Sequence, residues 1–287
     1  MTSLPERAAR RCYSAVNPIH SALYFSPDLE REFARAGLDH PRAAYFAARS
    51  APLGRVGPGA VTATFFNFKH ELVARHIPQA WDSVSPEGAL DARLRATDTL
   101  LRRLLGEETV ASKELAEAAE LALRAAEACT RPGRPLYAAN ADLPVPDAPH
   151  LAYWHASTLL REHRGDGHLV ALMAIGLDPV ESLVSHTAGG RGMTPKWNLA
   201  SRGWTAEEWE AAKERLRARG LLDAEGELTP AGTELRTGLE DETDRLDRAP
   251  YEHLGAAGVA RLTELAGGFT RAAQAAGAFP ADLIGKR

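Results

Sequence analysis

The sequence of 287 residues contains little that would mark a redox, zinc-binding or membrane protein. Its two cysteines, Cys12 and Cys129, form neither a C-x-x-C pair nor part of a ligand cluster, which argues against redox and zinc motifs. No run of about 18 apolar residues occurs, so we expect no transmembrane helix. The charged N-terminal residues are not followed by the apolar stretch of a signal peptide. We therefore expect a cytoplasmic protein that does not contact a membrane.

A surplus of positive charge is also missing. The chain has 34 Lys and Arg against 38 Asp and Glu, a formal net charge of −4. This balance argues against bulk electrostatic attraction to nucleic acid, although it leaves a local basic patch open. Hydrophobic residues make up 45% of the chain and charged residues 25%. Such values exclude a disordered or fibrous chain and are typical of a folded globular protein.

Helix start and stop signals dominate what is present. Ser26-Pro27, Ser85-Pro86 and Thr229-Pro230 each combine an N-cap residue with proline at the first helical position. Apolar residues recur at helical spacing after these pairs and in most other segments. The segment at 190–204 is rich in turn residues and is expected to be a loop. We expect helices over residues 5–24, 26–38, 40–52, 60–81, 85–106, 111–130, 151–164, 165–177, 178–190, 205–220, 229–254 and 255–276. At the start of the 60–81 segment, β-branched and aromatic residues favour a strand instead, so that alternative stays open.

A proline-rich segment at residues 131–149 divides the chain and has no helical period, as is typical of a semi-extended connection. We expect an all-helical N-terminal half at 1–130, with an aromatic-rich segment, and a second half at 150–287. The letters LLDAEGELT at 221–229 predict a short β-hairpin, because apolar residues flank a turn. The predicted fold is mostly α with this one hairpin, and the sequence does not decide whether the halves are one domain or two.

A specific pattern follows the 205–220 helix. That helix ends in R-x-x-G-L-L, the hairpin LDAEGELT follows, and T-x-A-G-x-x-L from Thr229 to Leu235 opens a long helix. From Thr205 to about Leu246 this order resembles the winged-helix core of MarR-type regulators. The resemblance implies a winged helix-turn-helix in the C-terminal half, with a recognition helix, a β-hairpin wing and the start of a dimerisation helix, so a homodimer is left open. Through YFAARSAPLG, TFFNF and LREHRGDGHLVAL, the whole chain also resembles an actinobacterial helix-turn-helix-like family of unassigned activity.

The elements that would meet DNA in such a regulator carry the wrong charge. A DNA-reading helix places its N-terminal residues on base edges and phosphates. Between Gly203 and Thr229 there are four basic residues against seven acidic ones. The first turns of the helix and the hairpin hold most of these carboxylates: Glu207, Glu208, Glu210, Asp223, Glu225 and Glu227. Because DNA is a polyanion, we expect a winged-helix scaffold without DNA binding.

Aromatic residues gather between residues 24 and 68, with polar residues interleaved. A hydrophobic core accounts for such a cluster, but polar groups among aromatics are also what an organic-ligand pocket requires. The candidate ligand-binding residues are Asn17, His20, Tyr24, Tyr45, Arg49, Phe65, Asn67, His155, His163, Arg164 and His168.

The densest polar cluster is REHRGDGH at 161–168, where His163, Asp166 and His168 are candidates for acid–base catalysis. The alternative is a helix–helix corner, with Gly165 ending one helix and Asp166 capping the next. The spacing of His155, His163 and His168 matches no zinc motif, so we expect neither metal nor cofactor. The Gly-Gly-Arg-Gly sequence at 189–192 is either a plain loop or a set of backbone N–H groups that could hold an anion.

These observations favour a protein that binds a small organic molecule on a MarR-like scaffold, as a sensor or a sequestering binder, with DNA binding lost. One alternative is an enzyme that uses His20, Arg49, His163, Asp166 and His168 in acid–base roles on a small organic substrate. The second alternative is a DNA-binding transcriptional regulator. The sequence does not decide whether the protein is an enzyme.

Overall fold

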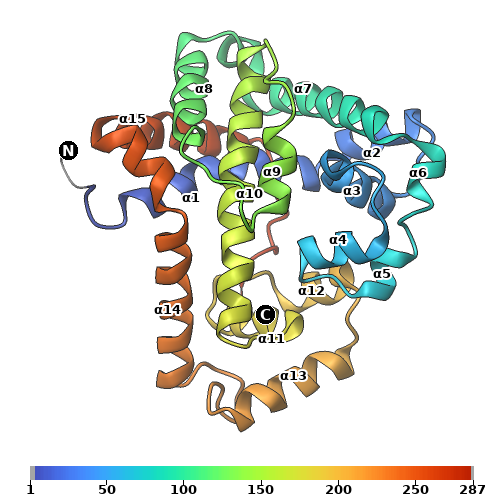
Figure 1. The fold of residues 1–287 in the computed structure, drawn as a ribbon, viewed down its shortest axis with the longest axis vertical. Helices are drawn as coiled ribbons and strands as arrows, with labels where there is room; N and C mark the ends of the chain where they lie inside the picture. Colours follow the sequence, from blue (N-terminus) through green and yellow to red (C-terminus); the bar gives the residue numbers. More distant parts are fainter. Residues whose placement is uncertain (1–3, 286–287) are drawn as a thin grey trace.

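The computed structural model describes residues 4–285, and the predicted mostly α fold is confirmed (Figure 1). The first elements are α1 (Ala8–Ser21), η1 (Ala22–Phe25), α2 (Pro27–Arg35), α3 (Pro41–Ser50), η2 (Ala51–Leu53), α4 (Pro58–Phe65), α5 (His70–Ala74), α6 (Ala80–Ser83), α7 (Pro86–Val110), α8 (Lys113–Ala126) and α9 (Pro135–Ala141). The remaining elements are α10 (Pro149–Ala174), α11 (Pro179–Ala188), α12 (Pro195–Arg202), α13 (Ala206–Ala218), α14 (Pro230–Leu246) and α15 (Arg248–Ala275).

The predicted N-caps begin helices as expected. The hydroxyl of Ser26 accepts a hydrogen bond from the Asp28 amide at 3.0 Å, and that of Ser85 accepts one from Gly88 at 3.1 Å. Each bond satisfies a backbone N–H that has no partner inside its helix. Gly106, the predicted stop, interrupts α7 with φ at 81°. Local sequence signals therefore fix these boundaries.

Buried apolar side chains form two clusters that α10 connects. The larger cluster joins α1, α2, α3, α7, α8 and α15 to the first half of α10, including Trp154. The smaller cluster joins the end of α10, including Leu172, to α11, α13 and α14. Figure 1 shows α10 running through the middle of the molecule, with α7, α8 and α15 near one end and α11 near the other. The division at 131–149 stays a prediction; that segment contains α9.

The predicted β-hairpin at 221–229 is wrong. No strand forms among residues 4–285, and the segment makes a single antiparallel bridge between Leu222 and Leu228. The Asp223 carboxylate accepts the Glu227 amide hydrogen at 2.8 Å, while the Asp223 amide donates to the Glu227 carbonyl at 2.9 Å. A side chain thus takes one of the bonds that a ladder needs, and the segment remains a turn with one bridge.

Further predictions of helix bounds fail. The helix expected over 229–254 ends at Leu246, and α15 begins at Arg248. Gly165 does not end a helix, since α10 continues through it. A glycine costs a helix only about 1 kcal/mol, and the clusters that hold both ends of α10 outweigh this. Residues 190–204 are not all loop, because α12 lies within them. The segment at 60–81 is not one helix either, because Phe66, with φ at 55°, separates α4 from α5.

The turn between α12 and α13 packs tightly on the aromatic-rich segment. Gly203 takes φ of 84° there, and a Cβ at this position would lie 2.8 Å from the Leu72 Cβ. The Lys69 amide donates to the Arg202 carbonyl at 2.9 Å, and the Trp204 indole donates to the Asn67 carbonyl at 2.9 Å. These contacts fix α12 against the N-terminal half.

No single helix within residues 4–285 is long and apolar enough to cross a membrane. Helices α10 and α11 reach that length and hydropathy only when taken together, and they are bent by 101° relative to each other.

Candidate functional site

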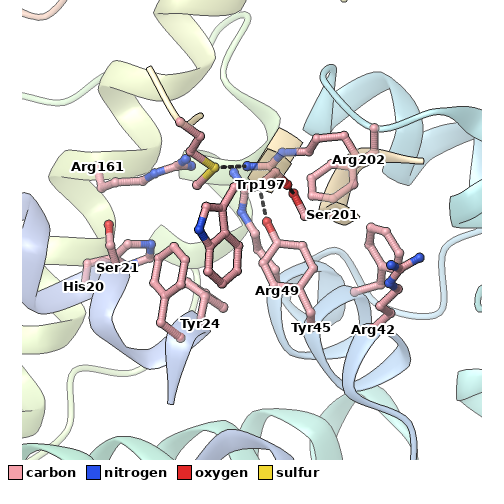
Figure 2. A pocket seen from close by; sticks show the side chains of 14 residues that line it. His20, Ser21, Tyr24, Arg42, Tyr45, Arg49, Arg161, Trp197, Ser201 and Arg202 are labelled. Atoms are coloured by element: carbon pink, nitrogen blue, oxygen red, sulfur yellow. Dashed lines mark hydrogen bonds between the residues drawn. The ribbon is translucent and has the colours of Figure 1, made fainter. Parts of the chain in front are cut away.

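A cavity of about 260 Å³ lies between the N-terminal helices and α12. One wall comes from α1, η1 and α3, a second from α12, and α10 contributes Arg161 (Figure 2). Its lining consists of His20, Ser21, Tyr24, Phe25, Arg42, Tyr45, Phe46, Arg49, Phe68, Arg161, Met193, Trp197, Ser201 and Arg202. Segments far apart in sequence therefore build one concave site, which we call the interhelical cavity.

Aromatic rings form the apolar wall of the interhelical cavity. The centroid of the Tyr45 ring lies 5.4 Å from that of Tyr24 and 5.5 Å from that of Phe68, distances typical of packed aromatic pairs. Figure 2 shows the Trp197 indole near the middle of the view, with Tyr24 and Tyr45 on either side. Burial keeps the pKa of His20 well below 6.5, so this imidazole is neutral at pH 7. The wall thus offers flat apolar surface.

Arginines supply the polar side of the cavity. Two nitrogens of Arg49 each donate to Glu162 at 3.3 Å, and Arg161 donates to the same carboxylate. Burial raises the pKa of Glu162, but the Arg161 and Arg49 guanidinium groups outweigh it and hold that pKa at about 2. Glu162 is therefore ionised at neutral pH and lies behind the cavity as the counter-ion of two arginines.

Arg202 has no such carboxylate among the residues that the structure describes. Its guanidinium lies over the Phe68 ring, 4.3 Å from the centroid, and its polar neighbours are the Met193 sulfur at 3.7 Å and the Tyr45 hydroxyl. Its Nε is buried without a hydrogen-bond partner. Burial lowers the pKa of Arg202, as expected for a cation held away from water. Arg49 and Arg161 lower that pKa further, so this partly buried cation lies near two others of the same sign. Such a charge is costly unless something else compensates it.

A smaller chamber of about 150 Å³ adjoins the interhelical cavity and shares Tyr45, Arg49, Phe68, Arg161 and Arg202 with it. The chamber adds several of the predicted site residues to the lining: Phe65, Asn67, Asp166 and His168. Burial raises the pKa of Asp166 to about 6, and the carboxylate accepts the Tyr137 amide hydrogen at 2.9 Å.

The structure divides the sequence-predicted residues into three groups. His20, Tyr24, Tyr45 and Arg49 line the interhelical cavity, whereas Phe65, Asn67, Asp166 and His168 line the chamber, which Tyr45 and Arg49 also border. The remaining candidates line neither space: Asn17, His155, His163 and Arg164.

Those four residues have other contacts. His163 is buried, and its Nδ1 lies 2.7 Å from Asp247. Arg164 donates to Asp244 at 2.7 Å. His155 borders a separate cavity beside Trp154, and Asn17 accepts a hydrogen bond from Ser21 at 3.3 Å. The REHRGDGH cluster therefore turns its members in several directions around α10.

Sequence reasoning missed the α12 wall, which includes Trp197, Ser201 and Arg202. A usable signal was present, because Thr194-Pro195 places a hydroxyl residue before proline, as do the pairs that begin α2, α7 and α14. The Thr194 hydroxyl accepts a hydrogen bond from the Trp197 amide at 3.4 Å. Sequence alone could not show that α12 faces Tyr24 and Tyr45.

The helix that follows, α13, keeps its basic residues in ion pairs. Lys213 lies 2.8 Å from Glu210, and Arg217 pairs with Glu214. Arg215 and Arg219 both reach Glu181 of α11, at 2.9 and 3.1 Å. Every basic residue between Ala206 and Arg219 therefore has a carboxylate partner within the protein.

No group of three or more His, Cys, Asp or Glu side chains in the described part of the chain could hold a metal ion. The cavity and the chamber are lined by aromatic rings, guanidinium groups, the imidazoles of His20 and His168, and two carboxylates, Glu162 and Asp166.

Comparison with known proteins identifies a family for the chain but no similar curated protein or solved structure. Residues 9–280 match the model of a helix-turn-helix family, so the match covers both walls of the interhelical cavity and the α11–α13 helices. The chain belongs to this helix-turn-helix family.

Proposed function

We propose that the protein binds a small organic molecule in the interhelical cavity. The observation that carries this proposal is a concave, aromatic-lined space whose walls come from both the N-terminal helices and α12. Ligand sites are typically apolar clefts with a few convergent polar groups. The volume of about 260 Å³ suits a compact ligand rather than a peptide.

We also propose that α11, α12 and α13 form the helix-turn-helix unit, and that this unit has lost DNA binding and serves as a sensor or sequestering scaffold. The ion pairs of Lys213, Arg215, Arg217 and Arg219 support this, because cations already paired are poorly placed to displace counter-ions from phosphates. The order of α12, α13, turn and α14 supports the MarR-like part of the proposal. Cytoplasmic location and a homodimer belong to the same proposal.

A DNA-binding regulator is the second candidate, and membership of a helix-turn-helix family favours it. An enzyme is the third. Two neighbouring carboxylates with divergent pKa values favour it, since Glu162 stays ionised while the pKa of Asp166 rises to about 6.

The ligand proposal predicts binding that Trp197 reports. A panel of one- and two-ring aromatic compounds, tested by quenching of tryptophan fluorescence, should contain members that saturate. Replacing Ser201, which lines the cavity, by phenylalanine should weaken those members about tenfold or more, because the larger ring occupies their space. Ser14→Phe, an exposed position on α1, is the matched control. Equal binding to both variants, or a panel without any hit, would contradict the proposal.

If DNA binding has been lost, the protein should not bind duplex DNA at either of two salt concentrations. Fluorescence anisotropy with random duplexes at 50 and 200 mM salt should show no saturable binding at micromolar protein. A genuine DNA-binding protein that neutralises six to ten phosphates loses about 10³–10⁵ in affinity across such a salt range. A steep salt slope, abolished by replacing Lys213 and Arg217 with glutamine, would favour the regulator instead.

A further inference from the structure

We propose that the ligand of the interhelical cavity is an organic anion: an aromatic or other flat apolar body that carries one carboxylate, received by Arg202. This inference rests on the proposed function, because it names the chemical class of the molecule bound there. It is drawn from the charges that surround the cavity.

Positive charge predominates in the interhelical cavity. Arg42, Arg49, Arg161 and Arg202 line the interhelical cavity, and no carboxylate stands among the described residues of its lining. Glu162 lies behind them and serves two of the four, Arg49 and Arg161. The site therefore keeps a surplus of positive charge, and burial strengthens the effect of that charge on an anion.

The four arginines differ in the groups that they contact. Arg42 donates to the Ala200 carbonyl at the rim, while Arg49 and Arg161 share Glu162. Within residues 4–285, Arg202 alone of the four has neither a carboxylate nor a carbonyl partner, and its Nε is buried without a hydrogen-bond partner there. Guanidinium groups bind carboxylates through paired N–H donors. The N–H donors of Arg202 are thus the ones that a bound carboxylate would pair with.

The side chains of Arg161 and Arg202 converge. Figure 2 shows Arg161 and Arg202 extending toward one another from opposite sides of the view, above the Trp197 indole. The Met193 sulfur already lies 3.7 Å from Arg202, so a carboxylate would reach Arg202 from the cavity side. Its attached ring would then lie beside Trp197, Tyr24 and Tyr45, where the apolar wall lies. The pKa of Tyr45 agrees with this potential: burial raises it, yet Arg49 and Arg202 outweigh burial and bring it below 10.

The test compares two probes of the same shape at pH 7 by titration calorimetry. 2-Naphthoate carries the carboxylate, and 2-naphthamide is its neutral counterpart. The wild-type protein should bind 2-naphthoate about tenfold or more tightly than 2-naphthamide. Arg202→Met should weaken 2-naphthoate at least five times more than 2-naphthamide, and Arg202→Lys should restore part of the difference.

The matched control is Arg271→Met, which removes one positive charge at an exposed position of α15 and should leave the ratio between the probes unchanged. Binding of 2-naphthamide as tight as that of 2-naphthoate would overturn the inference while leaving the cavity a ligand site. An equal loss of both probes in Arg202→Met would also overturn it. Failure of both probes and of the whole aromatic panel would overturn the proposed function as well.

Discussion

Gly232→Ala is expected to destabilise the protein by about 2–3 kcal/mol, the cost of forcing a methyl group into a closely packed site. A Cβ at this position would lie 2.1 Å from the Leu221 carbonyl oxygen and 3.2 Å from the Leu228 side chain. The first of these neighbours is backbone, and the same oxygen accepts the Thr229 amide hydrogen at 3.1 Å. This carbonyl oxygen therefore cannot move aside as a flexible side chain would. Urea unfolding followed by circular dichroism measures the change.

Gly238→Ala provides the control in the same helix, α14. Apart from its chain neighbours and the backbone of its own helix, no described atom lies within 4 Å of a Cβ there. The substitution should therefore be neutral or stabilising by up to about 1 kcal/mol, as expected for alanine in a helix. A free energy of unfolding for Gly232→Ala within 0.5 kcal/mol of the wild-type value, on the order of a surface substitution, would show that α14 does not approach the 221–229 turn this closely.

Glu162→Gln is expected to destabilise the protein by about 3–5 kcal/mol, the range found when one partner of a buried ion pair is removed. Glu162 is 1% exposed, and its loss leaves Arg49 and Arg161 without their counter-ion. Two cations would then face one another in a site that already contains Arg202. Unfolding by urea at pH 7, where the Glu162 carboxylate is ionised, measures the effect.

Two further variants make this prediction specific. Adding Arg49→Met to Glu162→Gln should recover part of the loss, because it removes one uncompensated cation. Glu242→Gln breaks an exposed pair with Arg245 and should cost less than about 1 kcal/mol. Similar costs for the buried and the exposed pair, or no recovery in the double variant, would mean that Glu162 does not hold the arginine cluster together.

Local chemistry made much of the fold predictable. Ser26, Ser85 and Thr229 begin helices because a hydroxyl before proline satisfies an orphan N–H whatever the tertiary context. The failures have two causes, distant contacts and a local side-chain hydrogen bond. Gly165 signals a stop, but α10 is held at both ends by different clusters and continues. The 221–229 turn has a hairpin pattern, yet the Asp223 side chain takes the place of a ladder bond.

The candidate site was predictable only from one side. Polar residues among aromatics between residues 24 and 68 indicated a pocket wall, and His20, Tyr24, Tyr45 and Arg49 do line the interhelical cavity. The opposite wall is α12, which meets them through contacts more than a hundred residues apart in sequence, such as the bond from Lys69 to Arg202. No local pattern encodes such a pairing. His163, in contrast, belongs to a conspicuous motif but pairs with Asp247 away from the cavity.

The central claim is that a ligand binds between the N-terminal helices and the helix-turn-helix unit. Amide hydrogen exchange with and without a saturating panel hit tests it most directly. Amide exchange should slow in both walls of the cavity: in η1 and α3 on one side, and in α12 on the other. Both walls would be ordered by the same molecule. Protection confined to one wall, or located only around α13 and the 221–229 turn, would contradict it.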